Sequence, residues 1–402
     1  MTWEQVVSVV ALVLAVAAVV VGLVLLRRIS ERSQRVPSLG TGSTEPAGST
    51  APTGPPAFVV NPIKVTDPRK LRTAVEQVCA EAGLPEPLWY ETTVADPGLG
   101  QARRALAAGA SVVVAAGGDG TVRSVAMALV GTSTPMGLLP LGTGNLLARN
   151  LDLPVDGARS LIRTALTGTD HPIDIGWVRP DRLRPAREDD EPGADSDAAI
   201  DTALDPGEDE HLFLVMAGVG FDAAMVAGAG DELKARVGWF AYFLAGARHL
   251  HGRKVRLRMS VDEEPGQHLR LRSLLFANCG RLPGGIVLLP DAQINDGWLD
   301  IAALDTRGGL FGWASLFGQV VGQGLGIRRQ LPNSPSTIEF WRGKQVRVLI
   351  EEPAHVQVDG DLIGEAVGLR VRVEPAGLYV RTNNVEESGS GATSAPNAAP
   401  SN

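Results

Sequence analysis

A glycine-rich turn, Gly117-Gly118-Asp119-Gly120-Thr121, is the feature that most constrains the fold of this chain. It follows an apolar, β-branched run over Ser111–Ala116 and precedes a segment, Thr121–Val130, with apolar residues at helical spacing. This pattern predicts a buried strand, a tight turn and a helix. Such a turn exposes backbone N–H groups and the positive end of the helix dipole, which is typical of a phosphate site. An ordinary strand–helix turn, the alternative, would need only one or two glycines.

Asp119 stands in the middle of this turn, where its carboxylate would repel a phosphate group. The residue makes chemical sense if a metal ion, or a hydroxyl group that loses its proton, also lies there. The turn is therefore predicted to serve phosphate chemistry rather than anion binding alone.

Short strands and helices alternate from Ala57 to residue 165, which predicts a doubly wound parallel α/β sheet. The expected strands cover 58–60, 88–90, 111–116 and 136–139. Ligands of such sheets bind beyond the carboxyl ends of the strands. Asn61, Gly117–Thr121 and Gly142–Asn145 all follow strands, so one site is expected to collect them.

The second part of the chain, residues 166–383, is rich in short alternating β segments separated by Gly and Pro. This texture predicts a C-terminal antiparallel β-sandwich. One helix is expected within it, around Glu232–His249. Asp181–Glu210 is strongly acidic and lacks aromatic residues, so it is predicted to be a disordered insertion. The Ser-, Ala- and Pro-rich tail over 384–402 is expected to be disordered as well.

An apolar run, Val6–Leu26, would span about 31 Å as a helix, the thickness of a bilayer core. A signal peptide would carry basic residues before such a run, but here Arg27, Arg28, Arg32 and Arg35 follow it. The positive-inside rule then predicts a single transmembrane anchor within residues 1–30, with everything after Arg27 on the cytoplasmic side of the cell membrane. Residues 31–56, rich in Gly, Ser, Thr and Pro, are expected to form a flexible linker.

The net charge of the chain and its two cysteines exclude some classes of function. The net charge of −8 argues against nucleic acid as a partner. Cys79 and Cys279 lie in apolar segments without disulfide or metal-ligand spacing, so they are expected to be reduced core thiols.

A series of further motifs accompanies the glycine turn. In chain order with it they are Val60-Asn61-Pro62, Pro140-Leu141-Gly142-Thr143-Gly144-Asn145, Leu147-Ala148-Arg149, Gly218-Val219-Gly220-Phe221-Asp222-Ala223, Gly284-Gly285, Asp296-Gly297-Trp298-Leu299-Asp300 and Asp359-Gly360. Together these motifs resemble the diacylglycerol kinase catalytic family, which includes sphingosine kinases and bacterial lipid kinases. The resemblance runs from Phe58 to about Thr382. The glycine turn alone also occurs in NAD kinases, so the specific signal is the complete series in order.

The resemblance implies ATP-dependent phosphorylation of a lipid hydroxyl group, with Mg²⁺, in a cleft between the two domains. Diacylglycerol is the expected substrate and phosphatidic acid the product. The nucleotide contacts implied by the resemblance fall at strand ends. They are Asn61, Pro62, Lys64, Thr92, Gly117, Gly118, Asp119, Gly120, Thr121, Val122 and Thr143.

The resemblance also implies a metal site, partly mediated by water, at the motif that contains Asp296. The matching positions are Gln293, Asp296 and the backbone of Trp298. A surface turn is the alternative for Asp296, and Asp300 is equally consistent with a strand-edge residue.

The catalytic base is where this chain departs from the family, in which a glutamate follows the late Asp-Gly pair. Here Asp359-Gly360 is followed by Asp361, which is shorter by one methylene group, or roughly 1.5 Å of reach. Either the backbone compensates and Asp361 is the base, or Asp119 takes that role. The chain also departs after Asn61-Pro62, where the small Ser/Gly-rich turn of the family is replaced by Ile63-Lys64-Val65-Thr66-Asp67.

The sequence therefore predicts a membrane-anchored lipid kinase whose partners are ATP, a membrane lipid and the membrane itself. A kinase confined to the bilayer surface shares a small volume with its substrate. An NAD kinase and a catalytically silent, membrane-tethered nucleotide-binding module remain the alternatives. The formation of a homodimer is left open.

Overall fold

The computed structural model describes residues 54–153, 157–183, 204–206, 210–220, 254–281, 287–306 and 336–383. None of the helices in these segments is long and apolar enough to cross a membrane. The predicted anchor over 6–26, the helix expected around 232–249 and the tail over 384–402 lie outside the described residues.

The first domain is built on four parallel strands, β1 (Ala57–Val60), β2 (Leu88–Glu91), β3 (Val113–Gly117) and β4 (Met136–Pro140). They lie in the order β2-β1-β3-β4, as expected for βα units wound in both directions. Each residue of β1 and β3 is buried, which fits their β-branched and small apolar sequences. The domain begins slightly before β1, because the carbonyls of Pro55 and Pro56 accept N–H groups from Ser111 and Leu88.

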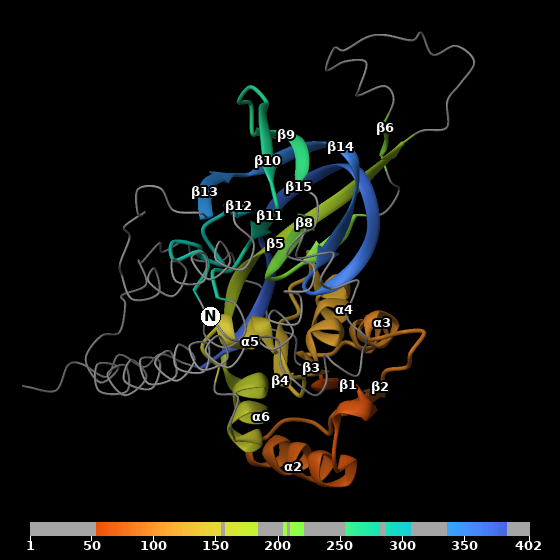
Figure 1. Ribbon diagram of the computed structural model, residues 1–402. Coiled ribbons are helices and arrows are strands. Elements are labelled where there is room, and N and C mark those ends of the chain that lie inside the picture. The colour runs from red at the N-terminus through yellow and green to blue at the C-terminus, as the bar shows by residue number, and fades with distance from the viewer. Residues whose placement is uncertain are drawn as a thin grey trace, which may run out of the picture. The chain divides into compact units, whose positions relative to one another are not determined.

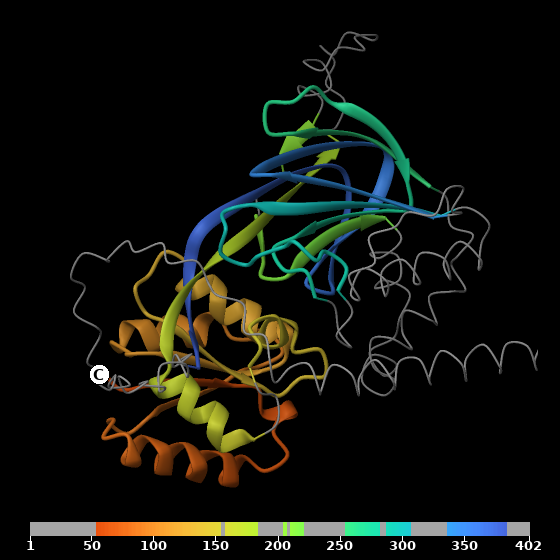
Figure 2. The same ribbon diagram turned by 90° about the vertical axis from the view of Figure 1, so that its left-hand side faces the viewer.

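Helices cover both faces of this sheet (Figures 1 and 2). α2 (Pro68–Glu81) and α6 (Ala158–Thr167) pack on one face, and α3 (Leu99–Ala107) and α4 (Asp119–Leu129) on the other. A short 3-10 turn, η1 (Pro62–Lys64), follows β1, and the five-residue α5 (Leu146–Asn150) follows β4. α2 begins with the Asp67 side chain accepting the N–H of Lys70 and with Pro68 as the first helical residue.

Two long strands, β5 (Thr169–Leu183) and β15 (Asp361–Thr382), connect this domain to the second one (Figure 1). They pair antiparallel along most of their length, with one irregularity between Glu374 and Leu378. β15 also pairs with β4, in parallel, through Val380 and Met136. The sheet is therefore mixed and continuous across both domains, whereas the sequence predicted a wholly parallel sheet for the first.

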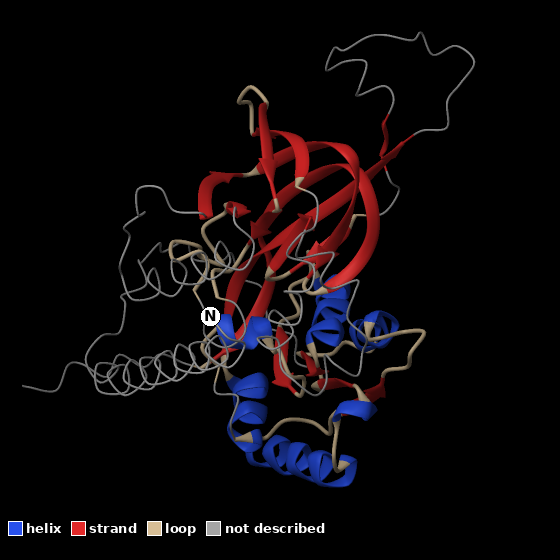
Figure 3. Cartoon of the chain, in the orientation of Figure 1, coloured by secondary structure: helices blue, strands red, loops and turns tan. Residues whose placement is uncertain are grey.

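The second domain is an antiparallel β-sandwich, as predicted (Figure 3). Its buried core includes Phe213, Phe276 and Met259, from strands far apart in the sequence. The remaining strands are β6 (Leu204–Pro206), β7 (His211–Phe213), β8 (Met216–Gly220), β9 (Val255–Val261), β10 (Gln267–Leu271), β11 (Ser273–Ala277), β12 (Leu299–Thr306), β13 (Ser336–Gly343) and β14 (Gln345–Val358).

The boundaries predicted for the acidic insertion are wrong at both ends. Asp181 is buried in β5 and forms an ion pair with Arg370. At the other end β6 pairs with the last residues of β5, and Glu210 forms an ion pair with Arg372 at 2.8 Å. Side chains that find partners in the sheet are ordered despite the acidic composition. Residues 184–203 and 207–209 lie outside the described residues.

Candidate active site

The glycine turn has the predicted geometry: β3 ends at Gly117 and α4 begins at Asp119. A Cβ atom on Gly117 would lie 2.6 Å from the side chain of Thr121, which leaves room only for glycine. The turn also packs against the loop after β4, because a Cβ atom on Gly142 would lie 2.7 Å from the Cα atom of Gly118. The two glycine-rich motifs are thus in backbone contact.

Asp119 joins these two motifs. Its carboxylate accepts the N–H of Asn145 at 3.0 Å through Oδ2 and that of Leu146 at 2.6 Å through Oδ1. Burial raises the pKa of Asp119 above its usual value, against the opposing effect of these amide groups, and the nearby Asp361 raises it further. Both oxygens of Asp119 are therefore already engaged in holding the loop before α5, a role that the sequence did not suggest.

Asp361 comes from the second domain and lies beside the glycine turn. It is the first residue of β15, and a Cβ atom on Gly120 would lie 3.8 Å from its Oδ2 atom. Its side chain is 53% exposed, so the carboxylate is open to solvent and to a substrate. The structure brings together the two candidate bases, Asp119 and Asp361, which are far apart in the sequence and belong to different domains.

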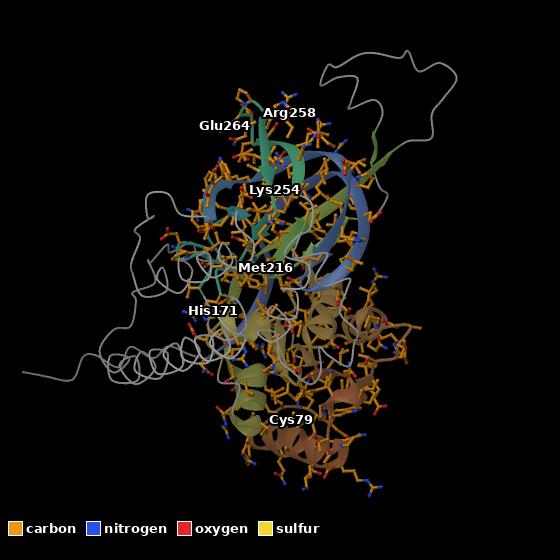
Figure 4. The ribbon with its side chains drawn as sticks, in the orientation of Figure 1. Cys79, His171, Met216, Lys254, Arg258 and Glu264 are labelled. Carbon is orange, nitrogen blue, oxygen red and sulfur yellow. The ribbon has the colours of Figure 1, made fainter. Side chains whose placement is uncertain are left out.

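Asp359 holds in place the hairpin turn that precedes Asp361. The carboxylate of Asp359 is buried and accepts the N–H groups of Leu214, Val215 and Met216 at 2.9, 2.9 and 3.0 Å. Burial raises its pKa, while Arg123 and these amide groups lower it. Asp359 and Gly360 both have positive φ, 47° and 87°, as a two-residue hairpin turn requires. Figure 4 shows Met216 where the sandwich approaches the first domain.

Arg123, in α4, is a site residue that the sequence interpretation missed. Its Nη2 donates to Asp361 Oδ2 at 2.6 Å and its Nη1 to the carbonyl of Val358 at 2.7 Å. The helix was predicted from its apolar positions alone, which do not include Arg123. A basic residue two positions after the glycine motif was the available signal.

The positions after β1 lie at the expected edge of the sheet. The N–H of Asn61 donates to the carbonyl of Ala116, directly before the glycine turn, at 2.9 Å. The Asn61 side chain accepts the N–H of Ile63 at 3.1 Å and so begins η1. Pro62 and Lys64 are exposed, which leaves Lys64 accessible to an anionic ligand.

The remaining residues that were predicted to contact the nucleotide differ in their exposure to solvent. Thr92 is buried, and its N–H donates to the carbonyl of Val60 at 2.9 Å. Thr121 and Val122 are buried on α4, and the Thr121 side chain packs against Gly117 within the turn. Thr143 is exposed in the loop after β4.

A cavity of about 470 Å³ opens beside Arg123. It is lined by α4, by the first turns of α3 with the preceding loop, and by Leu212 of β7. It therefore lies between the two domains, next to the hydrogen bonds that hold Asp361.

The predicted metal residues form a second group, with different partners. Asp296 accepts the N–H of Trp298 at 3.1 Å and forms an ion pair with Arg342. Asp300 lies 3.8 Å from the same guanidinium group, and its Oδ2 atom is buried without a partner among the described residues. Burial raises the pKa of the Asp300 carboxyl to about 6. Gln293, which lies three residues before Asp296 in the sequence, is exposed.

The donor chemistry of this second group fits a hard cation, because it offers two carboxylates, and one of them, Asp300, has a buried oxygen without a partner among the described residues. No cluster of three or more His, Cys, Asp or Glu side chains is placed to share a metal ion in the part of the chain that the structure describes. A Mg²⁺ ion here would therefore rely on few protein ligands and several waters, as Mg²⁺ commonly does.

Comparisons with known proteins follow the division into two domains. Residues 56–178 match the model of the diacylglycerol kinase catalytic domain, and residues 215–382 that of the YegS C-terminal NAD kinase beta sandwich-like domain. A probable lipid kinase YegS-like of Pseudomonas putida is 32% identical over 281 residues, covering 69% of this chain and 78% of the relative. A diacylglycerol kinase of Mycobacterium tuberculosis is 29% identical over 208 residues, covering 50% of this chain and 58% of the relative.

The fold has a counterpart among solved structures. The crystal structure of a diacylglycerol kinase from Bacillus anthracis superimposes with a TM-score of 0.60 at 16% identity, covering 82% of this chain and 97% of that one. At this identity the likeness concerns the fold alone.

Proposed function

The chain belongs to the diacylglycerol kinase family of lipid kinases, and we propose that it transfers the γ-phosphoryl group of ATP to a hydroxyl group of a membrane lipid. The observation that carries this proposal is the position of Asp361. This carboxylate, from the sandwich, lies over the glycine turn of the first domain. A base beside a phosphate-binding turn is the arrangement that phosphoryl transfer to a hydroxyl group needs.

The proposed step uses groups of this chain as follows. The N–H groups of the glycine turn and the N-terminus of α4 stabilise the negative charge of the phosphates. Asp361 accepts the proton of the lipid hydroxyl group as its oxygen bonds to the γ-phosphorus atom. The bond between that phosphorus and the β–γ bridging oxygen breaks, and ADP leaves. Asp119 holds the loop of Thr143 against the turn throughout.

We propose that Asp296 and Asp300 hold Mg²⁺, with Gln293 and the backbone carbonyl of Trp298 as further oxygen donors. When bound, the ion would neutralise local negative charge. We expect Mg²⁺ at ten times its dissociation constant to stabilise the wild type by about 1.4 kcal/mol.

Melting curves with and without Mg²⁺ check this expectation. The Asp296→Asn variant should lose the stabilisation, while Glu264→Gln, a change on the β9–β10 hairpin (Figure 4), should keep it. An equal response to Mg²⁺ in wild type and Asp296→Asn would place the ion elsewhere.

The membrane part of the proposal rests on the sequence. Residues 6–26 would anchor the enzyme as a single-pass protein of the cell membrane, with its catalytic part in the cytoplasm. Deletion of residues 1–35 should release the protein from membranes, while activity on detergent-dispersed lipid is retained. Fractionation and activity assays of the two forms test this. A truncated protein that fails to fold would assign Val6–Leu26 to the core instead.

The substrate is proposed to be diacylglycerol. The test offers ATP labelled in the γ-phosphate to the full-length protein in detergent micelles, with diacylglycerol, sphingosine or NAD as the acceptor. Label in phosphatidic acid supports the proposal. Label in sphingosine phosphate would change the lipid and keep the reaction, whereas label on NAD alone would replace the proposal with an NAD kinase.

A further inference from the structure

Arg123 follows the glycine turn in the sequence and contacts the candidate base, Asp361. It is the fifth residue of α4, and its side chain is only 22% exposed. Its guanidinium group reaches out of the first domain and contacts the sandwich. An arginine at this place could serve the ATP phosphates, the base, or the packing of the two domains.

Arg123 contacts the hairpin turn through the residue before it, Val358, and the residue after it, Asp361. Nη1 donates to the carbonyl of Val358, the last residue of β14, and Nη2 donates to Asp361 Oδ2, in the first residue of β15. The planar guanidinium group can donate to two acceptors in fixed directions, which a lysine ammonium group cannot do. Because Asp359 fixes the same turn from the sandwich side, the position of Asp361 is set from both domains.

Only one oxygen of Asp361 is used in this arrangement. Oδ2 is bound to Arg123, while Oδ1 has no partner among the residues that the structure describes. The Asp361 side chain is also more than half exposed. One carboxylate oxygen is thus held, and the other is available to accept a proton.

We propose that Arg123 is a positioning residue that orients Asp361 for proton removal from the lipid hydroxyl group. The inference rests on the proposed function, in which Asp361 is the base. By holding the turn through Val358, Arg123 draws the shorter aspartate toward the glycine turn, where a longer glutamate would need no such support. An exposed ion pair alone is worth about 0–1 kcal/mol, so the role of Arg123 concerns geometry more than stability.

A double-mutant cycle tests this role: wild type, Arg123→Gln, Asp361→Asn and the double variant, each measured for kcat and for the KM of ATP. We expect Arg123→Gln to lower kcat by about 10- to 100-fold, since a misplacement of about 1 Å can cost that much. The KM of ATP should change by less than about twofold. In the Asp361→Asn background the second change should cost almost nothing, because the base on which Arg123 acts is gone.

Two further variants separate geometry from charge and from folding. Arg123→Lys keeps the charge but cannot hold both acceptors, so its kcat should also fall. Arg163→Gln removes a comparable arginine–carboxylate contact, that with Glu81 at 3.0 Å, and should leave kcat unchanged. Should Arg123→Gln fail to fold, Arg123→Lys carries the cycle in its place.

The inference is overturned if Arg123→Gln raises the KM of ATP tenfold at constant kcat, which would make Arg123 a phosphate ligand. It is also overturned if the two single losses multiply in the double variant. Both results require a wild type that phosphorylates lipid. A wild type that phosphorylates no lipid contradicts the proposed function itself, so the two failures are distinguishable.

Discussion

Replacing Asp361 with asparagine should lower kcat for lipid phosphorylation by about 10²- to 10⁴-fold, the usual contribution of a general base. The KM of ATP should change little, because a base acts on the acceptor hydroxyl group rather than on the nucleotide. The amide is nearly isosteric with the carboxylate and keeps an oxygen for Arg123, so folding should be preserved. Steady-state kinetics at saturating ATP measure the effect.

Asp361→Glu is the informative companion variant. It restores the side chain that the family resemblance implies at this position, so it should be tolerated or faster than the wild type. Glu365→Gln, a change of an exposed carboxylate on the same strand, serves as the matched control and should leave kcat unchanged. Near wild-type rates for both Asp361→Asn and Asp361→Glu would remove Asp361 from the mechanism and return proton removal to Asp119.

Asp119→Asn should lower kcat by roughly 10²-fold or more, because it disturbs the relative positions of the two glycine motifs. An asparagine can accept only one of the two N–H groups, from Asn145 and Leu146, that the carboxylate now binds. The buried donor left unpaired should cost about 1–3 kcal/mol of stability and release the loop that carries Thr143. Activity assays and melting curves on the same preparation measure both effects.

A substitution of the N-cap residue of α2 provides the control for Asp119→Asn. Asp67→Ala removes the carboxylate that begins α2, at a cost of about 1 kcal/mol, far from the glycine turn in sequence. It should lower the melting temperature and leave kcat unchanged. Full activity in Asp119→Asn would show that the contact between the two motifs does not matter for catalysis.

The local parts of the fold could be predicted from the sequence. The β-branched run before Gly117 and the apolar spacing after Thr121 predict β3 and α4, and the structure confirms both. The sequence also places Asn61 and the glycine turn at strand ends, and the parallel order of β1 to β4 brings these ends to one edge of the sheet. The predictions of β3 and α4 depend only on neighbours along the chain, whereas the shared edge follows from the order of the strands.

Contacts between distant residues could not be predicted in this way. The pair of Arg123 and Asp361 joins residues 238 positions apart, and Asp119 binds amides of a different loop. The continuation of the first sheet into β15 likewise depends on tertiary pairing. An acidic composition suggested disorder at Asp181, but a single ion pair with Arg370 and a place in β5 decide otherwise.

The most direct test of the account is to count both products of one reaction. Full-length protein, ATP and diacylglycerol micelles are incubated together, and ADP and phosphatidic acid are quantified over time. We expect equal amounts of the two products in the wild type, and a loss of both in Asp361→Asn. ADP formed without phosphatidic acid, or neither product with the folded wild type, would contradict it.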